Sequence, residues 1–245
     1  EDHPHIYFMG AQRFDSQGKR GDEWTNFGEC FFFLPKVQFV KKETSLEVRI
    51  NIPKTVLQNE GRKSRFLFEL NSLLNFDYPV DKNATFASPS DFPSRQQWDT
   101  MVNKSVEELD KSHIEKIVLS RKQVIENNTM IESPDIYNKI KENAVNSYQF
   151  YLDIGDYQTF MSITPERLFK IEGKSLMIDS IAGTRARGKN ELEDKSNEYE
   201  LMNSSKELEE HRIVSREIQE KMMNLCSDID VTSKESVLKL KFAQH

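Results

Sequence analysis

Two consecutive hairpin patterns constrain the fold of this chain more strongly than any other part of its sequence. Strand-like runs end at Gly155-Asp156 and again at Gly173-Lys174, and both dipeptides are typical of tight turns. Strands that are joined by such short turns pair antiparallel. Because helical patterns occur before and after these hairpins, we expect an α+β fold with stacked, largely antiparallel β-sheets and helices on the outside.

Strand and helix patterns also fill the rest of the chain. Alternation of apolar and polar residues predicts the strands, and apolar residues at spacings of three and four predict the helices. Ser94 and Gln97 form a capping box that marks the start of one helix. Outside the hairpins, the predicted strands span residues 6–8, 29–34, 37–41, 46–52 and 116–125, the predicted helices span residues 55–74, 94–113, 133–146 and 203–225, and a loop is expected at 75–93.

The totals for the 245 residues are ordinary for a globular chain, with 37% hydrophobic and 30% charged residues, and a single domain over residues 1–245 is expected. A net charge of −6 disfavours nucleic acid as a partner, because phosphate binding needs a basic face. The longest apolar run, Cys30–Pro35, is too short to cross a bilayer, so no membrane partner is expected. Cys30 and Cys226 lie far apart in the sequence and fit the reduced thiols of a cytoplasmic protein.

Charged residues and a glycine loop gather in the stretch from Thr159 to His211. Glu166 follows a proline directly at the end of a predicted strand. The segment Ala182-Gly183-Thr184 ends another strand, where the glycine lets backbone N–H groups approach a ligand closely. Arg185 and Arg187 follow, and they fit the steering of an anion and the bracing of the loop equally well. This loop is a candidate anion-binding site.

A pair of carboxylates, Glu207 and Glu210, lies three residues apart on the last predicted helix. On a helical wheel Glu207 falls within the apolar stripe and Glu210 at its edge. Burial of a carboxylate is costly unless a cation receives it, and a divalent metal would do so. The alternative is a solvated acidic turn at a helix start, where negative charge is favoured. Together with the acid and the loop, the pair suggests a metal-assisted reaction on a small anion.

Four motifs occur in one order: EKIVLSR at residues 115–121, then PERLF, IAGTRARG and KELEEH. In this order and spacing they resemble those of the chorismate-utilising enzymes, most closely the isochorismate synthases of the menaquinone type. The N-terminal part is similar more weakly, because Met9-Gly10-Ala11 departs from the usual double glycine of the family. In that family another large segment follows, with a second metal-binding glutamate and the residues that hold the substrate carboxylates. The resemblance therefore implies a chorismate-binding fold that is incomplete at its C-terminus.

The resemblance implies that water attacks C2 of chorismate while the C4 hydroxyl leaves, which gives isochorismate. Lys116 would be the base that activates the water, and Glu166 would be the acid that protonates the leaving oxygen, from opposite sides of one pocket. Taken without the resemblance, Lys116 is a surface charge at the start of a strand. Chorismate is thus the expected small-molecule partner, and the sequence predicts no oligomeric state.

The resemblance also implies Mg²⁺ as the cofactor, because carboxylate oxygens suit a hard cation. Glu210 would be a direct metal ligand, and Glu207 would act through water. Gly183 would present its backbone to the substrate, with Thr184 beside it. His211 follows a metal ligand but points into the apolar stripe, so we predict a structural histidine that forms a hydrogen bond.

Other activities of the same family fit to different degrees. Anthranilate synthases carry glutamine where this chain has Lys116, and aminodeoxychorismate synthases usually carry lysine where this chain has Ala182. Salicylate synthases share all four motifs and add the elimination of pyruvate, so they remain an alternative, as does a siderophore pathway instead of a menaquinone pathway. An alternative of another class is an inactive fragment or a non-catalytic module of such an enzyme.

Overall fold

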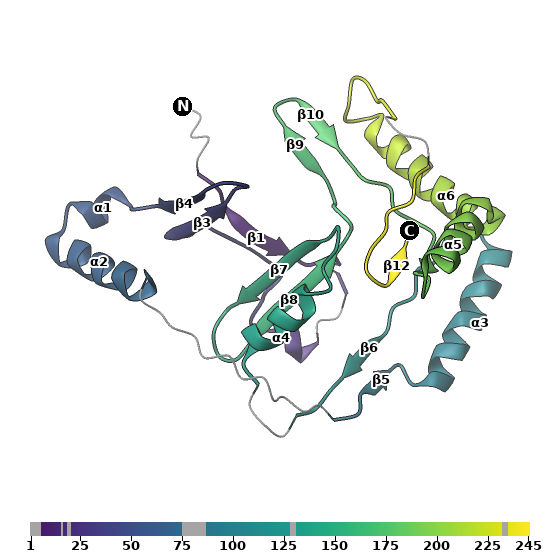
Figure 1. Cartoon of the computed structure of the whole chain (residues 1–245), viewed down its shortest axis with the longest axis horizontal. Helices are drawn as coiled ribbons and strands as arrows, with labels where there is room; N and C mark the ends of the chain where they lie inside the picture. The colour runs from purple at the N-terminus through teal and green to yellow at the C-terminus, as the bar shows by residue number, and fades with distance from the viewer. Residues whose placement is uncertain (1–5, 16, 19–20, 75–86, 128–130, 232–234) are drawn as a thin grey trace. The chain divides into compact units, whose positions relative to one another are not determined.

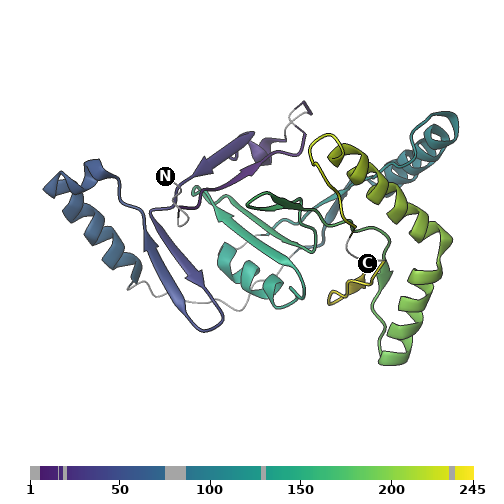
Figure 2. The ribbon, with the colours of Figure 1, turned by 90° about the horizontal axis from the view of Figure 1, so that it is seen from above.

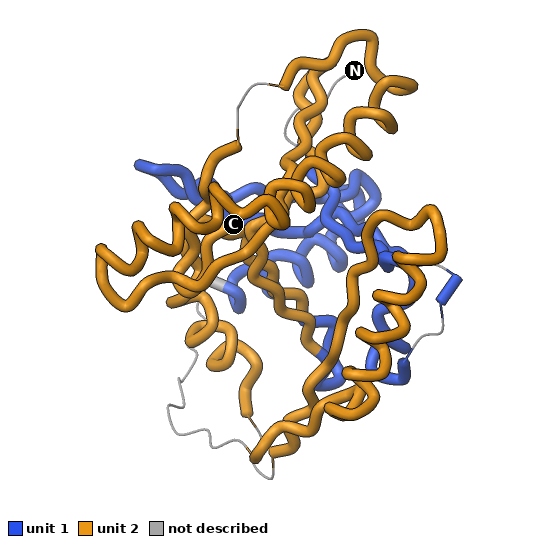
Figure 3. Tube along the Cα trace, turned by 90° about the vertical axis from the view of Figure 1, so that its right-hand side faces the viewer, with its two compact units in different colours: residues 1–80, 153–158 blue, residues 81–152, 159–245 orange. Residues whose placement is uncertain are grey.

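The computed structural model describes residues 6–15, 17–18, 21–74, 87–127, 131–231 and 235–245. Two compact units make up the chain, and Figure 3 colours them separately. Unit 1 contains residues 1–80 and 153–158, and unit 2 contains residues 81–152 and 159–245. Whether the two units together form the single domain predicted over residues 1–245 stays a prediction. Most of the predicted loop at 75–93 lies outside the described residues.

The described residues of unit 1 form two antiparallel strand pairs, two α-helices and one 3-10 helix (Figure 1). β1 pairs with β2, and β3 pairs with β4 around a turn in which the Lys42 N–H donates to the Ser45 carbonyl oxygen over 2.8 Å. Phe66 on the second helix is buried, with 8% of its surface exposed. The elements are β1 (Met9–Gln12), the 3-10 helix η1 (Asp22–Trp24), β2 (Cys30–Phe33), β3 (Val37–Lys41), β4 (Leu46–Ile50), α1 (Lys54–Leu57) and α2 (Glu60–Leu74).

Two of the predictions for unit 1 need correction. The first strand lies at Met9–Gln12, after the predicted residues 6–8, because residues 9–12 pair with β2 in the antiparallel sheet. The helix predicted at 55–74 is interrupted between α1 and α2. At the interruption, the side chain of Asn59 accepts a hydrogen bond from the Arg62 N–H over 3.0 Å and so starts a new helix.

The described residues of unit 2 form the remaining strands and four helices, and the two predicted hairpins are found as β7–β8 and β9–β10. The turn between β7 and β8, whose residues 153–158 are assigned to unit 1, has positive φ at Gly155 (84°), Asp156 (50°) and Tyr157 (60°). The capping box of α3 is confirmed, with Ser94 and Gln97 bonded reciprocally. The elements are β5 (Ser90–Phe92), α3 (Arg95–Lys111), β6 (Lys122–Val124), α4 (Ser133–Lys141), β7 (Tyr148–Asp153), β8 (Thr159–Thr164), β9 (Lys170–Glu172), β10 (Ser175–Met177), β11 (Arg185–Ala186), α5 (Glu191–Asn203), α6 (Ser205–Met222) and β12 (Ala243–Gln244).

The last predicted helix begins later and ends earlier than expected, at Ser205 and Met222, and a separate helix α5 precedes it (Figure 2). Ser204 separates the two helices in an extended conformation, and its side chain accepts a hydrogen bond from the Glu207 N–H. The strand predicted at 116–125 is reduced to β6, which pairs with β5. Alternation predicts which residues share a face, but a strand also needs a hydrogen-bonded neighbour.

Polar groups occupy the most enclosed positions of unit 2. Among the residues that the structure describes in this unit, Leu201 is the buried apolar side chain, with 5% of its surface exposed. Asp194, Glu207 and Gln244 are also buried, at 8%, 8% and 0% exposed. They lie on α5, α6 and β12 around β11. Helices long and apolar enough to cross a membrane do not occur in the described part of the chain.

The predicted fold class is confirmed by these elements. Helices and strands are mixed, and the strand pairs with a determined register are all antiparallel. Each sheet in the described residues has two strands.

Candidate active site

The predicted anion-binding loop passes directly over the start of α6. Gly183 has φ +80°, a conformation that glycine adopts easily and other residues rarely do. A Cβ atom at this position would lie 3.3 Å from Cβ and 3.3 Å from Oε2 of Glu207. Glycine is therefore required here both by its backbone conformation and by the close approach of the helix.

Glu207 is bound by the loop itself. Its Oε1 atom accepts a hydrogen bond from Nη1 of Arg185 over 2.7 Å, and its Oε2 atom accepts one from the Thr184 N–H over 3.3 Å. Burial acts to raise the pKa of Glu207, but the bonds from Arg185 and Thr184 outweigh it and hold the pKa below its ordinary value. The cation paired with the buried carboxylate of Glu207 is thus Arg185, whereas the sequence predicted a divalent metal in this role.

Glu210 lies next to Lys116. The Lys116 Nζ atom is 3.1 Å from Oε1 of Glu210, and both side chains are half-buried. Lys116 belongs to the segment without regular secondary structure that precedes β6, so this contact joins the first and the last of the four motifs. Lys116 also lines a cavity of about 540 Å³ beside α6, together with Ile213 and Glu217.

Glu166 lies at the end of β8 and is exposed. Its N–H donates to the Oγ1 atom of Thr164 over 3.2 Å, which fixes its backbone. The preceding Pro165 lines a second cavity of about 500 Å³, to which Ala182 and His245 also contribute. Lys116 and Glu166 share neither of these two cavities, so their predicted position across one pocket stays a prediction.

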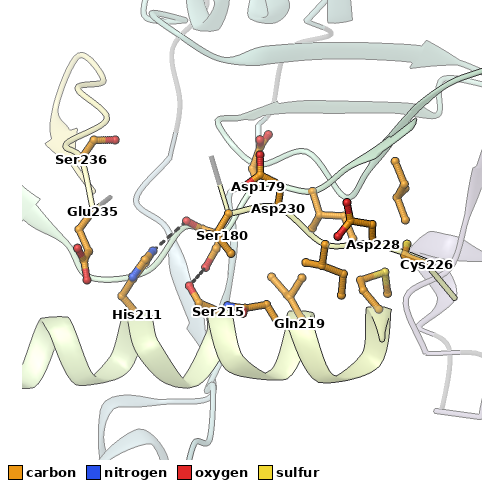
Figure 4. A pocket seen from close by; sticks show the side chains of 16 residues that line it. Asp179, Ser180, His211, Ser215, Gln219, Cys226, Asp228, Asp230, Glu235 and Ser236 are labelled. Carbon is orange, nitrogen blue, oxygen red and sulfur yellow. Dashed lines mark hydrogen bonds between the residues drawn. The ribbon is translucent and has the colours of Figure 1, made fainter. Parts of the chain in front are cut away.

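His211 forms a hydrogen bond, as predicted. Its Nε2 atom lies 3.2 Å from the Ser180 carbonyl oxygen, and the hydroxyl groups of Ser180 and Ser215 lie 2.8 Å apart (Figure 4). These bonds fix α6 to the segment after β10. A third cavity of about 390 Å³ opens beside them, and Asp228 and Asp230 contribute to its wall.

The role of Arg187 is to brace the loop. Its guanidinium binds both carboxylate oxygens of Asp194, at 2.6 and 2.9 Å, and its Nη1 atom donates to the Leu240 carbonyl oxygen over 2.6 Å. Arg185 is likewise occupied by Glu207. Of the two roles left open by the sequence, the structure shows bracing for both arginines.

Sequence reasoning missed two residues beside the loop. Asp194 lies in an acidic run that is typical of a solvated surface. The available signal was the short distance in sequence from Arg187 and Gly188, which bind its carboxylate. His245 follows β12, and its Nδ1 atom lies 3.0 Å from Oγ1 of Thr184 and 3.2 Å from the Gly183 carbonyl oxygen. This contact depends on the pairing of β11 with β12, which are far apart in the sequence, so a local sequence pattern does not predict it.

The two helix carboxylates are ligands of the type that Mg²⁺ prefers, but two side chains are too few to form a metal site. Glu207 and Glu210 supply oxygen atoms, which a hard cation prefers. However, each is paired with a cationic side chain, and groups of three or more acidic, histidine or cysteine side chains that could hold a metal do not occur among the described residues. Further ligands would be needed to complete a metal site.

Comparison with known proteins gives a consistent result. A family described as "Chorismate binding enzyme" matches residues 1–245. A chloroplastic isochorismate synthase from Catharanthus roseus is 26% identical over 250 residues, which cover 99% of this chain and 43% of that protein. The isochorismate synthase MenF of Bacillus subtilis is 25% identical over 244 residues, which cover 97% of this chain and 50% of that protein.

A solved structure shares the fold. The structure of MenF, the menaquinone-specific isochorismate synthase from Escherichia coli, superposes with a TM-score of 0.77 and 18% sequence identity. The match covers 89% of this chain and 50% of that chain. The chain thus spans about half the length of the relatives that it matches.

Proposed function

Because this chain belongs to the family of chorismate-binding enzymes, we propose that it acts as an isochorismate synthase, which converts chorismate to isochorismate. The observation that carries the proposal is the contact between Lys116 and Glu210 at 3.1 Å. Two motifs that are remote in the sequence, and that the resemblance assigns to one site, meet there. Relatives that bear this name match nearly the whole chain.

In the proposed reaction Lys116 removes a proton from the water that attacks C2. A lysine does this only as a neutral amine. The Lys116 Nζ atom lies 3.1 Å from Oε1 of Glu210, so Lys116 must leave this contact to reach the water. Proton transfer by a positioned side chain contributes roughly 10²–10⁴-fold to a rate.

Glu166 donates the proton that the C4 oxygen needs when it leaves. Its backbone is fixed at the end of β8, and its exposed carboxyl is free to approach a ligand in the cavity lined by the adjacent Pro165. Gly183 and Thr184 border the same region and would contact the substrate. Ala182 and His245 line this cavity and connect it to the loop.

We also propose Mg²⁺ as the cofactor, with Glu210 as a direct ligand and Glu207 bound through water, once further ligands complete the site. The ion, when bound, would neutralise a substrate carboxylate. Menaquinone synthesis is the proposed pathway, in line with the menaquinone-specific neighbour from Escherichia coli. The free thiols of Cys30 and Cys226 support a reducing compartment, for which we propose the cytoplasm.

The decisive experiment is a product assay on the full chain with chorismate and Mg²⁺. Isochorismate, salicylate and pyruvate are separated by chromatography, and we expect isochorismate as the product. Salicylate with pyruvate would identify the salicylate synthase alternative instead. Chorismate binding without turnover would identify a non-catalytic module, and the absence of both binding and turnover would refute the proposal. A matched reaction with a chelator tests the requirement for Mg²⁺.

A further inference from the structure

Asp194 is a buried carboxylate of unit 2 that accepts several hydrogen bonds. It lies in the first turn of α5 with 8% of its surface exposed. Its Oδ1 atom accepts hydrogen bonds from Nε of Arg187 over 2.6 Å and from the Gly188 N–H over 2.9 Å. Its Oδ2 atom accepts hydrogen bonds from Nη2 of Arg187 over 2.9 Å and from Nζ of Lys239 over 3.2 Å. One carboxylate thus holds two cationic side chains from segments far apart in the sequence.

The two cations lie in the segments next to the two strands that form one small sheet. Arg187 directly follows β11, and its N–H donates to the Phe242 carbonyl oxygen over 3.0 Å. Lys239 precedes β12 and also binds Glu198 on α5 over 2.6 Å. β11 and β12 pair antiparallel, with Arg185 opposite Gln244. Asp194 therefore attaches both strands to the start of α5.

The packing at this attachment is tight. A Cβ atom at Gly188 would lie 2.1 Å from the backbone nitrogen of Asp194, so the loop approaches the helix too closely for any side chain at this position. Gln244 is fully buried between them, and its amide nitrogen lies 3.4 Å from the Ala186 carbonyl oxygen. The position of the loop relative to α5 is thus set by backbone contact as well as by charge.

The far ends of the same two strands carry the proposed substrate-binding groups. Gly183 and Thr184 precede β11, and His245 follows β12. Because the strands are antiparallel, these ends lie side by side, and the His245 ring contacts the Thr184 hydroxyl over 3.0 Å. A displacement of either strand at Asp194 would be transmitted to this contact.

We infer that Asp194 is a positioning residue for the proposed chorismate site. It contacts no predicted site residue directly and acts through Arg187 and Lys239, which fix β11 and β12 and thereby the Gly183-Thr184 backbone and the ring of His245. The inference rests on the proposed function where the substrate is concerned. The attachment of the two strands rests on the contacts alone.

The test compares Asp194→Asn with Glu191→Gln in the full chain. Both substitutions remove one negative charge from the first turn of α5, but Glu191 is a surface residue that pairs with Lys195. Amide hydrogen exchange is measured in residues 183–188 and 238–245, and kcat and KM are measured for chorismate. For Asp194→Asn we expect exchange in both segments to become about tenfold faster and the KM to rise about tenfold, because hydrogen bonds to a charged group are lost. Glu191→Gln should leave both readouts unchanged.

Lys239→Met provides a second variant if Asp194→Asn does not fold. It removes one of the two cations and leaves the Arg187 contact. Amide exchange should therefore become faster and the KM should rise, each by less than in Asp194→Asn. The inference is overturned if the variants of Asp194 and Lys239 behave like Glu191→Gln. It is also overturned if kcat falls with the amount of folded protein while the KM stays unchanged, because that is the result of a merely structural role.

The two proposals fail in different ways. If the unsubstituted chain neither binds nor converts chorismate, the proposed function is wrong and the link from Asp194 to a substrate is lost with it. The exchange measurement then still decides whether Asp194 attaches the two strands. If chorismate is converted and Asp194→Asn changes neither exchange nor KM, the proposed function stands and the positioning role is wrong.

Discussion

At the residue scale, the charges of the candidate site neutralise one another within the chain. Arg185 binds Glu207, and Lys116 binds Glu210, each as an ion pair shorter than 3.2 Å. The resemblance to the chorismate-utilising enzymes predicted the four motifs as one site, and it could not show which side chain of one motif meets which of another. Such pairings depend on strand and helix positions that a linear pattern does not contain.

Replacement of the proposed base and acid tests their roles directly. Lys116→Ala and Glu166→Gln should each abolish measurable isochorismate formation, since each removes a proton-transfer group worth roughly 10²–10⁴-fold. Circular dichroism should show an intact fold, because an ion pair near the surface contributes only about 0–1 kcal/mol. Lys111→Ala, which changes an exposed lysine on α3, serves as the control. A near-normal rate for either variant would remove that residue from the mechanism.

Asp194 should make the stability of the chain depend on acid pH. Hydrogen bonds from Arg187, from the Gly188 N–H and from Lys239 hold the pKa of Asp194 below its ordinary value of 3.8, despite the opposing effect of burial. A carboxylate with a lowered folded-state pKa stabilises the fold above its unfolded-state pKa and loses this contribution as the pH falls.

Thermal melting of the unsubstituted chain and of Asp194→Asn between pH 2 and pH 7 measures this effect. The difference in melting temperature should be constant well above pH 3.8 and should shrink as the pH falls below that value. A difference that grows on acidification would show that the carboxylate is not stabilised by its cationic partners.

At the scale of the elements, the confirmed predictions include those whose hydrogen bonds join residues close together in the sequence. The capping box of α3 and the two hairpins contain their hydrogen-bond partners within a few residues, and all three are confirmed. The start of the last helix, predicted at residue 203, lies close to the observed start of α6 at Ser205, where the Ser204 side chain caps the helix. The preceding helix α5 was not predicted, because its acidic sequence shows no apolar stripe. The strand predicted at 116–125 is confirmed over Lys122–Val124, where its partner β5 lies far from it in the sequence.

The capping box offers a stability prediction for one helix. Ser94→Ala removes the side chain that accepts from the Gln97 N–H, and it should lower the free energy of unfolding by about 1 kcal/mol. Asn103→Ala in the interior of the same helix should instead raise it by a few tenths of a kcal/mol, roughly the difference in helix propensity. Urea denaturation followed by circular dichroism measures both changes. Equal shifts of the same sign would mean that the cap does not stabilise the helix.

At the scale of the whole molecule, few apolar side chains are enclosed. Phe66 and Leu201 are the buried ones within the described residues, and each described sheet has two strands. Large apolar side chains such as Leu168 and Leu225 are exposed. With 37% hydrophobic residues, the composition is ordinary for a globular chain. Whether these residues pack together depends on strand pairing across long sequence distances, which composition does not contain.

The exposed apolar surface should be detectable in solution. The 245-residue chain in isolation should bind the dye ANS strongly and self-associate with rising concentration, since large apolar patches and open strand edges favour both. Leu168→Glu and Leu225→Glu should reduce the dye signal without loss of secondary structure. Weak dye binding by a monodisperse monomer would show that these faces are covered in solution.

The division into units has a further consequence for how the chain can be dissected. Residues 153–158 at the tip of the β7–β8 hairpin group with unit 1, whereas the strands on either side of the tip belong, apart from Asp153, to unit 2. The polypeptide therefore passes between the units more than once. A single proteolytic nick or gene truncation cannot release either unit intact, and recombination could not exchange one of them as a continuous cassette.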